Sequence, residues 1–181
     1  MKLLLHCCCA PCSLSCVNSL REKGMEPELY WYNPNIHPYT EYKARRDCLA
    51  LFAANENLKL EMSDEYALRL FLNLVLPAGE KRCEKCYTLR LEKTAFLAAQ
   101  KGFQVFSTSL LISPYQDHDA IKRIGEQAAA KHDLEFYYSD FRHLFREGQS
   151  VSRARGLYMQ KYCGCIFSEE ERYVKRNGDG C

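Results

Sequence analysis

Three short motifs contain eight of the chain's eleven cysteines, and their spacing suits metal or redox chemistry. The first motif is "LLLHCCCAPCS", with Cys8, Cys9 and Cys12 after an apolar run. Pro11 suits the first turn of a helix, so the motif is a strand-to-helix junction. Backbone N–H groups at a helix start favour negative charge and lower a thiol pKa, and thiolates are the metal-binding form. Cys7, on the strand, is expected to be a small buried apolar side chain.

The second motif, "KRCEKCYTLRLEK", contains a C-x2-C pair, Cys83 and Cys86. Residues three apart share one helix face, so both sulfur atoms can reach the same centre. Metal and redox sites are the usual uses of such a pair, although a chance pair in a cysteine-rich chain is the alternative. Several basic residues nearby would offset the charge of thiolates: Lys81, Arg82, Lys85 and Arg90.

The third motif, "KYCGCIF", places Cys163 and Cys165 around one glycine. A one-residue spacer gives a small, strained disulfide ring, and strained disulfides are easily reduced. Gly164 supplies the backbone freedom that ring closure needs. The pattern favours a redox-active pair, with two further metal ligands as the alternative.

The cysteine set as a whole predicts a thiolate metal site. Two adjacent cysteines and a C-x2-C pair can hold structural zinc or an iron–sulfur cluster. Adjacent Cys8 and Cys9 differ from the C-x2-4-C half of a zinc ribbon, and a redox pair has no use beside inert zinc, so iron–sulfur is favoured. Cys16 and Cys48 fall in helical patterns and are expected to pack in the interior, whereas Cys181 ends a tail that we expect to be mobile.

The elements that position these motifs follow from the apolar pattern. Strands are predicted at residues 2–7, 27–35, 58–62, 103–111 and 134–139. Helices are predicted at 12–23, 40–57 and 115–132, and across 63–102 with a break near 76–81. The alternation predicts an α/β fold with a doubly wound, mostly parallel five-stranded sheet. Ligands bind beyond the carboxyl ends of such strands, where the first strand places the cysteine run and the fourth places "STSLLISPYQ".

Length and composition are those of one globular domain. A chain of 181 residues with a net charge of +2 fits a single domain over 1–181, with 141–181 as a basic, mostly helical extension packed on it. The apolar run at residues 3–5 is too short for a signal peptide, and no later segment has the length to cross a bilayer. We therefore expect a cytoplasmic protein with reduced thiols and no membrane partner.

Basic and aromatic residues alternate in the segment 141–162. This combination is typical of single-stranded RNA recognition, and a solvated charged face is the alternative. The residues are Phe141, Arg142, Phe145, Arg146, Arg153, Arg155, Tyr158, Lys161 and Tyr162. A second basic segment contains His37, Lys43, Arg45 and Arg46. Asp117, His118 and Asp119 could supply a proton or a metal ligand, or could simply be the charged start of a helix.

Five stretches that together span most of the chain resemble the epoxyqueuosine reductases of the QueH type. They are "LLHCCCAPCS", "YNPNIHPYTEYKARR", "RCEKCYTLRL", "FSTSLLISPYQ" and "SRARGLYMQKYCGCIFSEEER". The resemblance implies an adenine-nucleotide-hydrolase-like α/β fold. It also implies deoxygenation of epoxyqueuosine in the anticodon loop of tRNA to queuosine, with electrons from an external donor that the motifs do not identify.

The resemblance also implies roles for individual cysteines. Cys8, Cys9, Cys83 and Cys86 are similar to the ligands of a 4Fe-4S cluster, and Cys163 and Cys165 to a redox-active pair. Cys12 is the candidate ligand of a second, mononuclear iron. Two other classes stay open: a thioredoxin-like oxidoreductase using the C-x2-C of residues 9–12, and a zinc-bound RNA-binding module.

Overall fold

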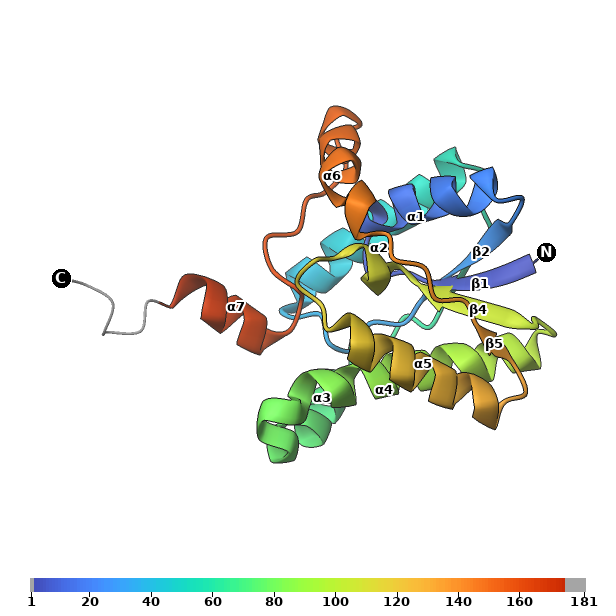
Figure 1. Ribbon diagram of the computed structural model, residues 1–181. Coiled ribbons are helices and arrows are strands. Elements are labelled where there is room, and N and C mark those ends of the chain that lie inside the picture. Colours follow the sequence, from blue (N-terminus) through green and yellow to red (C-terminus); the bar gives the residue numbers. More distant parts are fainter. Residues whose placement is uncertain (1, 175–181) are drawn as a thin grey trace.

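The computed structural model describes residues 2–174, and Figure 1 shows a central sheet with helices on both faces. The strands are β1 (Lys2–His6), β2 (Glu26–Trp31), β3 (Leu60–Met62), β4 (Val105–Thr108) and β5 (Glu135–Phe136). They lie in the order β3-β2-β1-β4-β5, and every pairing is parallel. The predicted five-stranded doubly wound sheet is thus confirmed, and it is wholly parallel. Cys181 lies outside the described residues.

The helices form a layer on each side of the sheet (Figure 1). One layer contains α1 (Ala10–Glu22), α2 (Tyr39–Asn55) and α6 (Phe145–Ala154). The other contains α3 (Leu68–Val75), α4 (Arg82–Gln100) and α5 (His118–Lys131). Three short 3-10 helices are η1 (Leu76–Lys81), η2 (Ser109–Ile112) and η3 (Arg142–Leu144), and α7 (Ile166–Tyr173) extends beyond the carboxyl ends of the strands. Over residues 2–174, every helix falls short of the length and apolar character that crossing a membrane requires.

Strand β1 is the centre of the sheet and has helices over both of its faces. Leu3, Leu4 and Leu5 are all buried, because a parallel strand covered on both sides needs a continuous apolar run. β1 pairs with β2 on one side and with β4 on the other. The chain order reverses between β1 and β4, so the crevice for a ligand is expected beyond the ends of these two strands.

Strand β4 ends earlier than the apolar pattern predicts. The prediction extended it to residue 111, but the strand stops at Thr108 and η2 follows. The Thr108 side chain accepts a hydrogen bond from the backbone N–H of Leu110 at 3.2 Å. Such a side-chain bond competes with the strand ladder and turns the chain. The turn directs the next residue, Ser109, toward the end of β1.

Helix α6, in the C-terminal part of the chain, packs closely against α1. A Cβ atom added at Gly148 would lie 2.3 Å from Oγ of Ser15, so only glycine permits this approach. The helix therefore brings the segment that follows it to the side of the sheet where α1 begins.

Candidate active site

The thiols of Cys8, Cys9 and Cys12, here called the cysteine triad, lie together at the junction between β1 and α1. Their Sγ atoms are all within 4.8 Å of one another. Cys9 is the N-cap of α1, and its Sγ accepts a hydrogen bond from the backbone N–H of Cys12 at 3.3 Å. Pro11 lies in the first turn, as predicted. Three convergent buried thiols can bind a metal ion.

The serine after β4 contacts the triad from the neighbouring strand. The Ser109 hydroxyl accepts a hydrogen bond from the backbone N–H of Cys8 at 3.1 Å and donates to its Sγ at 3.5 Å. The prediction that the first and fourth strands place residues at the same edge is therefore confirmed. Cys7 is buried and donates to the carbonyl of Leu5 at 3.3 Å, as expected for a small interior side chain.

Within the triad, Cys8 is the thiol that favours the ionised form. Hydrogen bonds from the thiols of Cys12 and Cys9 lower the pKa of Cys8, and the charge of Arg90 acts in the same direction. The hydrogen bond with Cys8 raises the pKa of Cys12, and burial raises the pKa of Cys9. The pKa of Cys8 is thus lowered as predicted, but by the neighbouring thiols and Arg90 rather than by the helix start. The predicted lowering is wrong for Cys9 and Cys12, because burial and the hydrogen bonding with Cys8 raise the pKa of each.

Cys83 and Cys86 lie in the first turns of α4 and differ in exposure. Cys86 is buried, whereas Cys83 is exposed. Burial raises the pKa of Cys86 to about 12, against the opposing charge of Arg90. Among residues 2–174, only the cysteine triad brings three potential metal ligands within 4.8 Å of one another. The four-thiol set that joins this pair to Cys8 and Cys9 therefore stays a prediction.

Of the four basic residues predicted to offset thiolate charge, Arg90 is the buried one, with 1% of its surface exposed. Nη1 of Arg90 lies 3.9 Å from Sγ of Cys86, and Nη2 donates to Oδ1 of Asn33 at 2.9 Å. Asn33 in turn donates to the carbonyl of Cys7 at 2.8 Å. Arg82 instead pairs with Glu171 of α7. Arg90 is therefore the cation of this group that the structure holds inside the site.

Residues 157–165, here called the C-terminal strap, connect α6 to α7 and contain Cys163 and Cys165. Arg45 of α2 is 1% exposed and donates to the carbonyls of Tyr162 and Cys163, both at 2.9 Å. Its Nε pairs with the carboxylate of Glu41 at 2.7 Å. A buried, charge-paired arginine thus holds the strap against α2.

The glycine of the strap is required by its surroundings. Gly164 has a φ of 139°, and an added Cβ would lie 3.1 Å from Cγ1 of Ile36 and 3.3 Å from Nη1 of Arg45. Its carbonyl accepts a hydrogen bond from the backbone N–H of His37 at 2.8 Å. Backbone conformation and close packing both select glycine here, in addition to the freedom predicted for ring closure.

The two strap cysteines have different environments. Cys163 keeps solvent access, and the Gln116 amide donates to its Sγ at 3.4 Å. Gln116 also accepts a hydrogen bond from the Tyr87 hydroxyl at 2.8 Å. Desolvation by the surrounding protein raises the pKa of Cys163. Cys165 is the N-cap of α7, and both thiols are free, so the redox pairing stays a prediction.

Two glutamines complete the site, and sequence reasoning did not single out either of them. Gln116 contacts Cys163, and Gln160 of the strap donates to Sγ of Cys12 at 3.2 Å. The strap thus contacts the triad directly. Gln116 lies inside the quoted stretch "FSTSLLISPYQ", but an amide side chain has no spacing signal that would separate it from an ordinary surface residue.

For the second basic segment, the predicted contact with RNA is wrong at two of the four residues. Arg45 and His37 are both buried, and both hold the strap rather than facing solvent. Lys43 is exposed and pairs with Asp47 one helical turn along α2. Such pairs on a solvated face contribute little, and they leave Lys43 available to a partner.

The C-terminal basic segment is only partly a free surface. Phe141 is fully buried, so its predicted role in base stacking is wrong. Arg142 pairs with Asp140, and Arg155 pairs with Glu56. A smaller set is exposed and takes part in none of the ion pairs found among residues 2–174: Arg146, Arg153 and Lys161.

The charged residues before α5 form a helix start. Asp117 is the N-cap, and its carboxylate accepts a hydrogen bond from the backbone N–H of Ala120 at 3.0 Å. His118 is buried with Nε2 3.1 Å from the carbonyl of Ser113, and Asp119 is exposed in the first turn. These contacts favour the helix-start interpretation over a proton donor or metal ligand.

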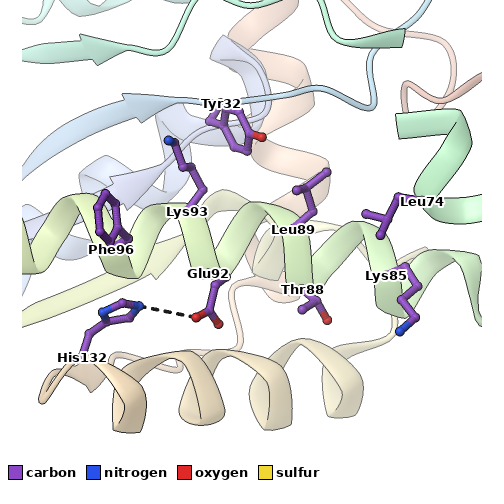
Figure 2. Close-up of a pocket in the computed structure, with 9 residues that line it drawn as sticks. All are labelled: Tyr32, Leu74, Lys85, Thr88, Leu89, Glu92, Lys93, Phe96 and His132. Atoms are coloured by element: carbon purple, nitrogen blue, oxygen red, sulfur yellow. Dashed lines mark ion pairs between the residues drawn. The ribbon is translucent and has the colours of Figure 1, made fainter. Parts of the chain in front are cut away.

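A separate hollow of about 470 Å³ runs along the outer side of α4 and is mostly apolar (Figure 2). Figure 2 shows Leu74 of α3 and Phe96 of α4 bordering it, with Tyr32 on one side and the Glu92–His132 pair on the other. No cysteine of residues 2–174 lines this hollow. The chemistry-bearing side chains instead converge at the ends of β1 and β4.

Fold and site together define an adenine-nucleotide-hydrolase-like α/β protein with a buried thiol site suited to a metal. A crystal structure of a protein described as a predicted subunit of a tRNA methyltransferase from Methanocaldococcus jannaschii shares the fold. The TM-score is 0.52 at 13% identity, covering 87% of this chain and 89% of that one.

The chain belongs to the epoxyqueuosine reductase QueH family, whose family model matches residues 3–171. A relative named epoxyqueuosine reductase QueH from Dehalococcoides mccartyi is 36% identical over 176 residues, covering 97% of each chain. One of the same name from Thermotoga maritima is 37% identical, covering 96% of this chain and 93% of its own. The resemblance predicted from the five sequence stretches is confirmed.

Proposed function

We propose that this chain is an epoxyqueuosine reductase, which converts epoxyqueuosine in the anticodon loop of tRNA to queuosine. The observation that carries the proposal is the buried cysteine triad, contacted by a strap with an exposed thiol, in a chain of the QueH family. The reaction removes the epoxide oxygen as water and leaves an alkene, so it consumes two electrons and two protons.

The thiol donors suit an iron–sulfur cofactor. Four thiolates are the usual ligand set of a 4Fe-4S cluster. We assign that role to Cys8, Cys9, Cys83 and Cys86, and the role of ligand to a second, mononuclear iron to Cys12. When bound, the cluster supplies electrons singly and an iron with an open position acts as a Lewis acid. Burial of the triad and a buried cation beside Cys86 both fit an anionic group.

The strap thiols balance the electron count. Oxidation of Cys163 and Cys165 to a disulfide forms one S–S bond and releases two electrons and two protons, which is what deoxygenation consumes. An external donor then reduces the disulfide. The Gln116 amide stabilises a thiolate at Cys163, because a hydrogen bond to the charged form favours that form.

The tRNA contact surface is assigned to the exposed side of the C-terminal segment. Arg146 and Arg153 of α6 and Lys161 of the strap are exposed cations, and Lys161 follows Gln160, which contacts Cys12. Cations of this kind bind phosphates with a salt-sensitive affinity. We place the protein in the cytoplasm as a single-domain enzyme and expect it to grip the anticodon arm through these residues.

The deciding experiment is anaerobic purification followed by iron, sulfide and zinc analysis and an assay on tRNA that carries epoxyqueuosine. About four iron and four sulfide per chain, with extra iron, are expected for the wild type. Conversion to queuosine is read by mass spectrometry of the nucleosides. A Cys83→Ala, Cys86→Ala double variant is expected to lose the cluster. Cys48→Ala, at a half-buried cysteine of α2, is the matched control that keeps it.

Stoichiometric zinc without sulfide, in protein never exposed to air, would contradict the proposal. That result would favour a zinc-bound RNA-binding module. A cluster that forms without any turnover of the tRNA would retain the cofactor assignment and remove the proposed reaction.

A further inference from the structure

Arg90 is a buried cation whose two hydrogen-bond partners, an amide and a thiol, are neutral groups. Its Nη2 donates to the neutral amide of Asn33, and its Nη1 is 3.9 Å from the thiol of Cys86. Its Nε is buried without a hydrogen-bond partner among residues 2–174. With 1% of the residue exposed, solvent does not compensate the charge.

The ion pairs within the described part of the chain do not include Arg90. An unpaired guanidinium in the interior is strongly unfavourable, since its desolvation is not repaid. The thiols whose charge acts on it are Cys86, Cys8 and Cys163, which come from the three separate cysteine motifs. Thiols of all three motifs therefore meet a common charge at Arg90.

We propose that Arg90 is the counter-cation of the thiolate site and that its charge sets the reduction potential of the iron–sulfur group held there. This rests on the cofactor assigned under the proposed function. Reduction adds negative charge to such a group, and a fixed positive charge a few ångströms away stabilises the reduced state. The effect is large in a buried site, because neither water nor salt screens it. Arg90 acts here through its charge on the thiols, beside which Asn33 and Cys86 hold it.

Asn33 is part of this arrangement. It accepts from Arg90 and donates to the carbonyl of Cys7, so it fixes the guanidinium relative to the backbone that leads into the triad. Arg90 cannot swing toward solvent without breaking that bond. The charge is therefore held at a constant distance from the thiols, as tuning of a potential requires.

The test is an anaerobic redox titration of the reconstituted protein without tRNA, followed by absorption and electron paramagnetic resonance. Arg90→Met is expected to lower the midpoint so that reduction is at least tenfold less favourable, which is about 59 mV for one electron. Arg90→Lys keeps the charge and is expected to recover at least half of that shift. Lys93→Met, at an exposed cation one turn along α4, is the matched control and is expected to leave the midpoint unchanged.

A second variant keeps the test decisive if Arg90→Met does not load iron. Asn33→Asp retains the guanidinium and places a carboxylate beside it, so the midpoint is again expected to fall. Midpoints of Arg90→Met and Asn33→Asp that equal that of Lys93→Met would overturn the inference. A wild type that holds the cluster but does not convert epoxyqueuosine would contradict only the proposed function. The inference about Arg90 would still be tested, because the potential is measured without tRNA.

Discussion

Arg45 and Arg90 are buried to the same extent, on helices that cover opposite faces of the sheet. Arg45 is paired with Glu41 and donates to two strap carbonyls, so its charge is satisfied by the chain itself. Arg90 has an amide and a thiol as partners. The first arginine is explained by folding alone. The second has a charge that the described chain leaves without an ion-pair partner, which fits the anionic group proposed for the thiols.

The largest loss of stability is expected when the paired arginine, Arg45, is replaced. Arg45→Met leaves the Glu41 carboxylate buried without its partner and removes two donors from the strap. Breaking a buried pair in this way costs about 3–5 kcal/mol. Urea unfolding under anaerobic, reducing conditions measures it. A Glu41→Gln, Arg45→Met double variant should lose less than the two single variants together, and strict additivity would contradict a coupled pair.

The next largest loss of stability is expected at Gly164, the glycine that lies against Arg45. Gly164→Ala forces an alanine into positive φ and places its Cβ against Ile36 and Arg45, at a cost of about 1–3 kcal/mol. Gly156→Ala is the matched control, because Gly156 also has positive φ but nothing within 4 Å of an added Cβ. The larger loss expected at Gly164 combines the packing of the strap with a backbone φ of 139°, against 66° at Gly156. Equal losses would show that the strap does not press on Arg45.

For the unpaired arginine, the effect of substitution should depend on the metal. In metal-free protein, Arg90→Met removes an uncompensated charge but leaves Asn33 without its donor, so stability should change by less than about 2 kcal/mol. In loaded protein the same change should destabilise clearly, since the anionic group loses its counter-charge. Thermal unfolding with and without reconstitution measures both. An identical change in stability with and without the metal would contradict the proposed difference between Arg90 and Arg45.

The smallest expected effect concerns pH. Burial lowers the pKa of His37, whose backbone N–H holds the strap. The unfolded chain therefore takes up a proton near pH 6.5 while the native state does not, and stability falls as pH drops below that value, by at most ~1.4 kcal/mol per pH unit. His37→Gln should flatten this part of the profile between pH 8 and 5.5. His6, with a pKa lowered to about 3 by burial, contributes a slope that both proteins share.

The sequence allowed the sheet and the cysteine motifs to be predicted because both depend on short-range patterns. The apolar run at residues 3–5 and Pro11 determine where β1 ends and α1 begins, so the position of the triad followed directly. Cys83 and Cys86 were correctly placed at the start of a helix for the same reason.

The two buried arginines were harder to interpret, because burial of a charge depends on partners far along the chain. Arg45 contacts carbonyls 117 and 118 residues away, and it was predicted to face RNA. Gln160 meets Cys12 across 148 residues. No local spacing predicts such contacts; they appear only once the strap is folded back across α2 and the start of α1.

The contact between Gln160 and Cys12 has a consequence for how the protein is assembled in the cell. The triad has exposed fractions of only 8%, 1% and 6% for Cys8, Cys9 and Cys12, and the strap contacts it through Gln160. Under the proposed cofactor assignment, the metal reaches the triad either before the strap docks or while the strap is detached. Loading of the proposed metal site and docking of the strap are then coupled steps, because the same Gln160–Cys12 contact belongs to both.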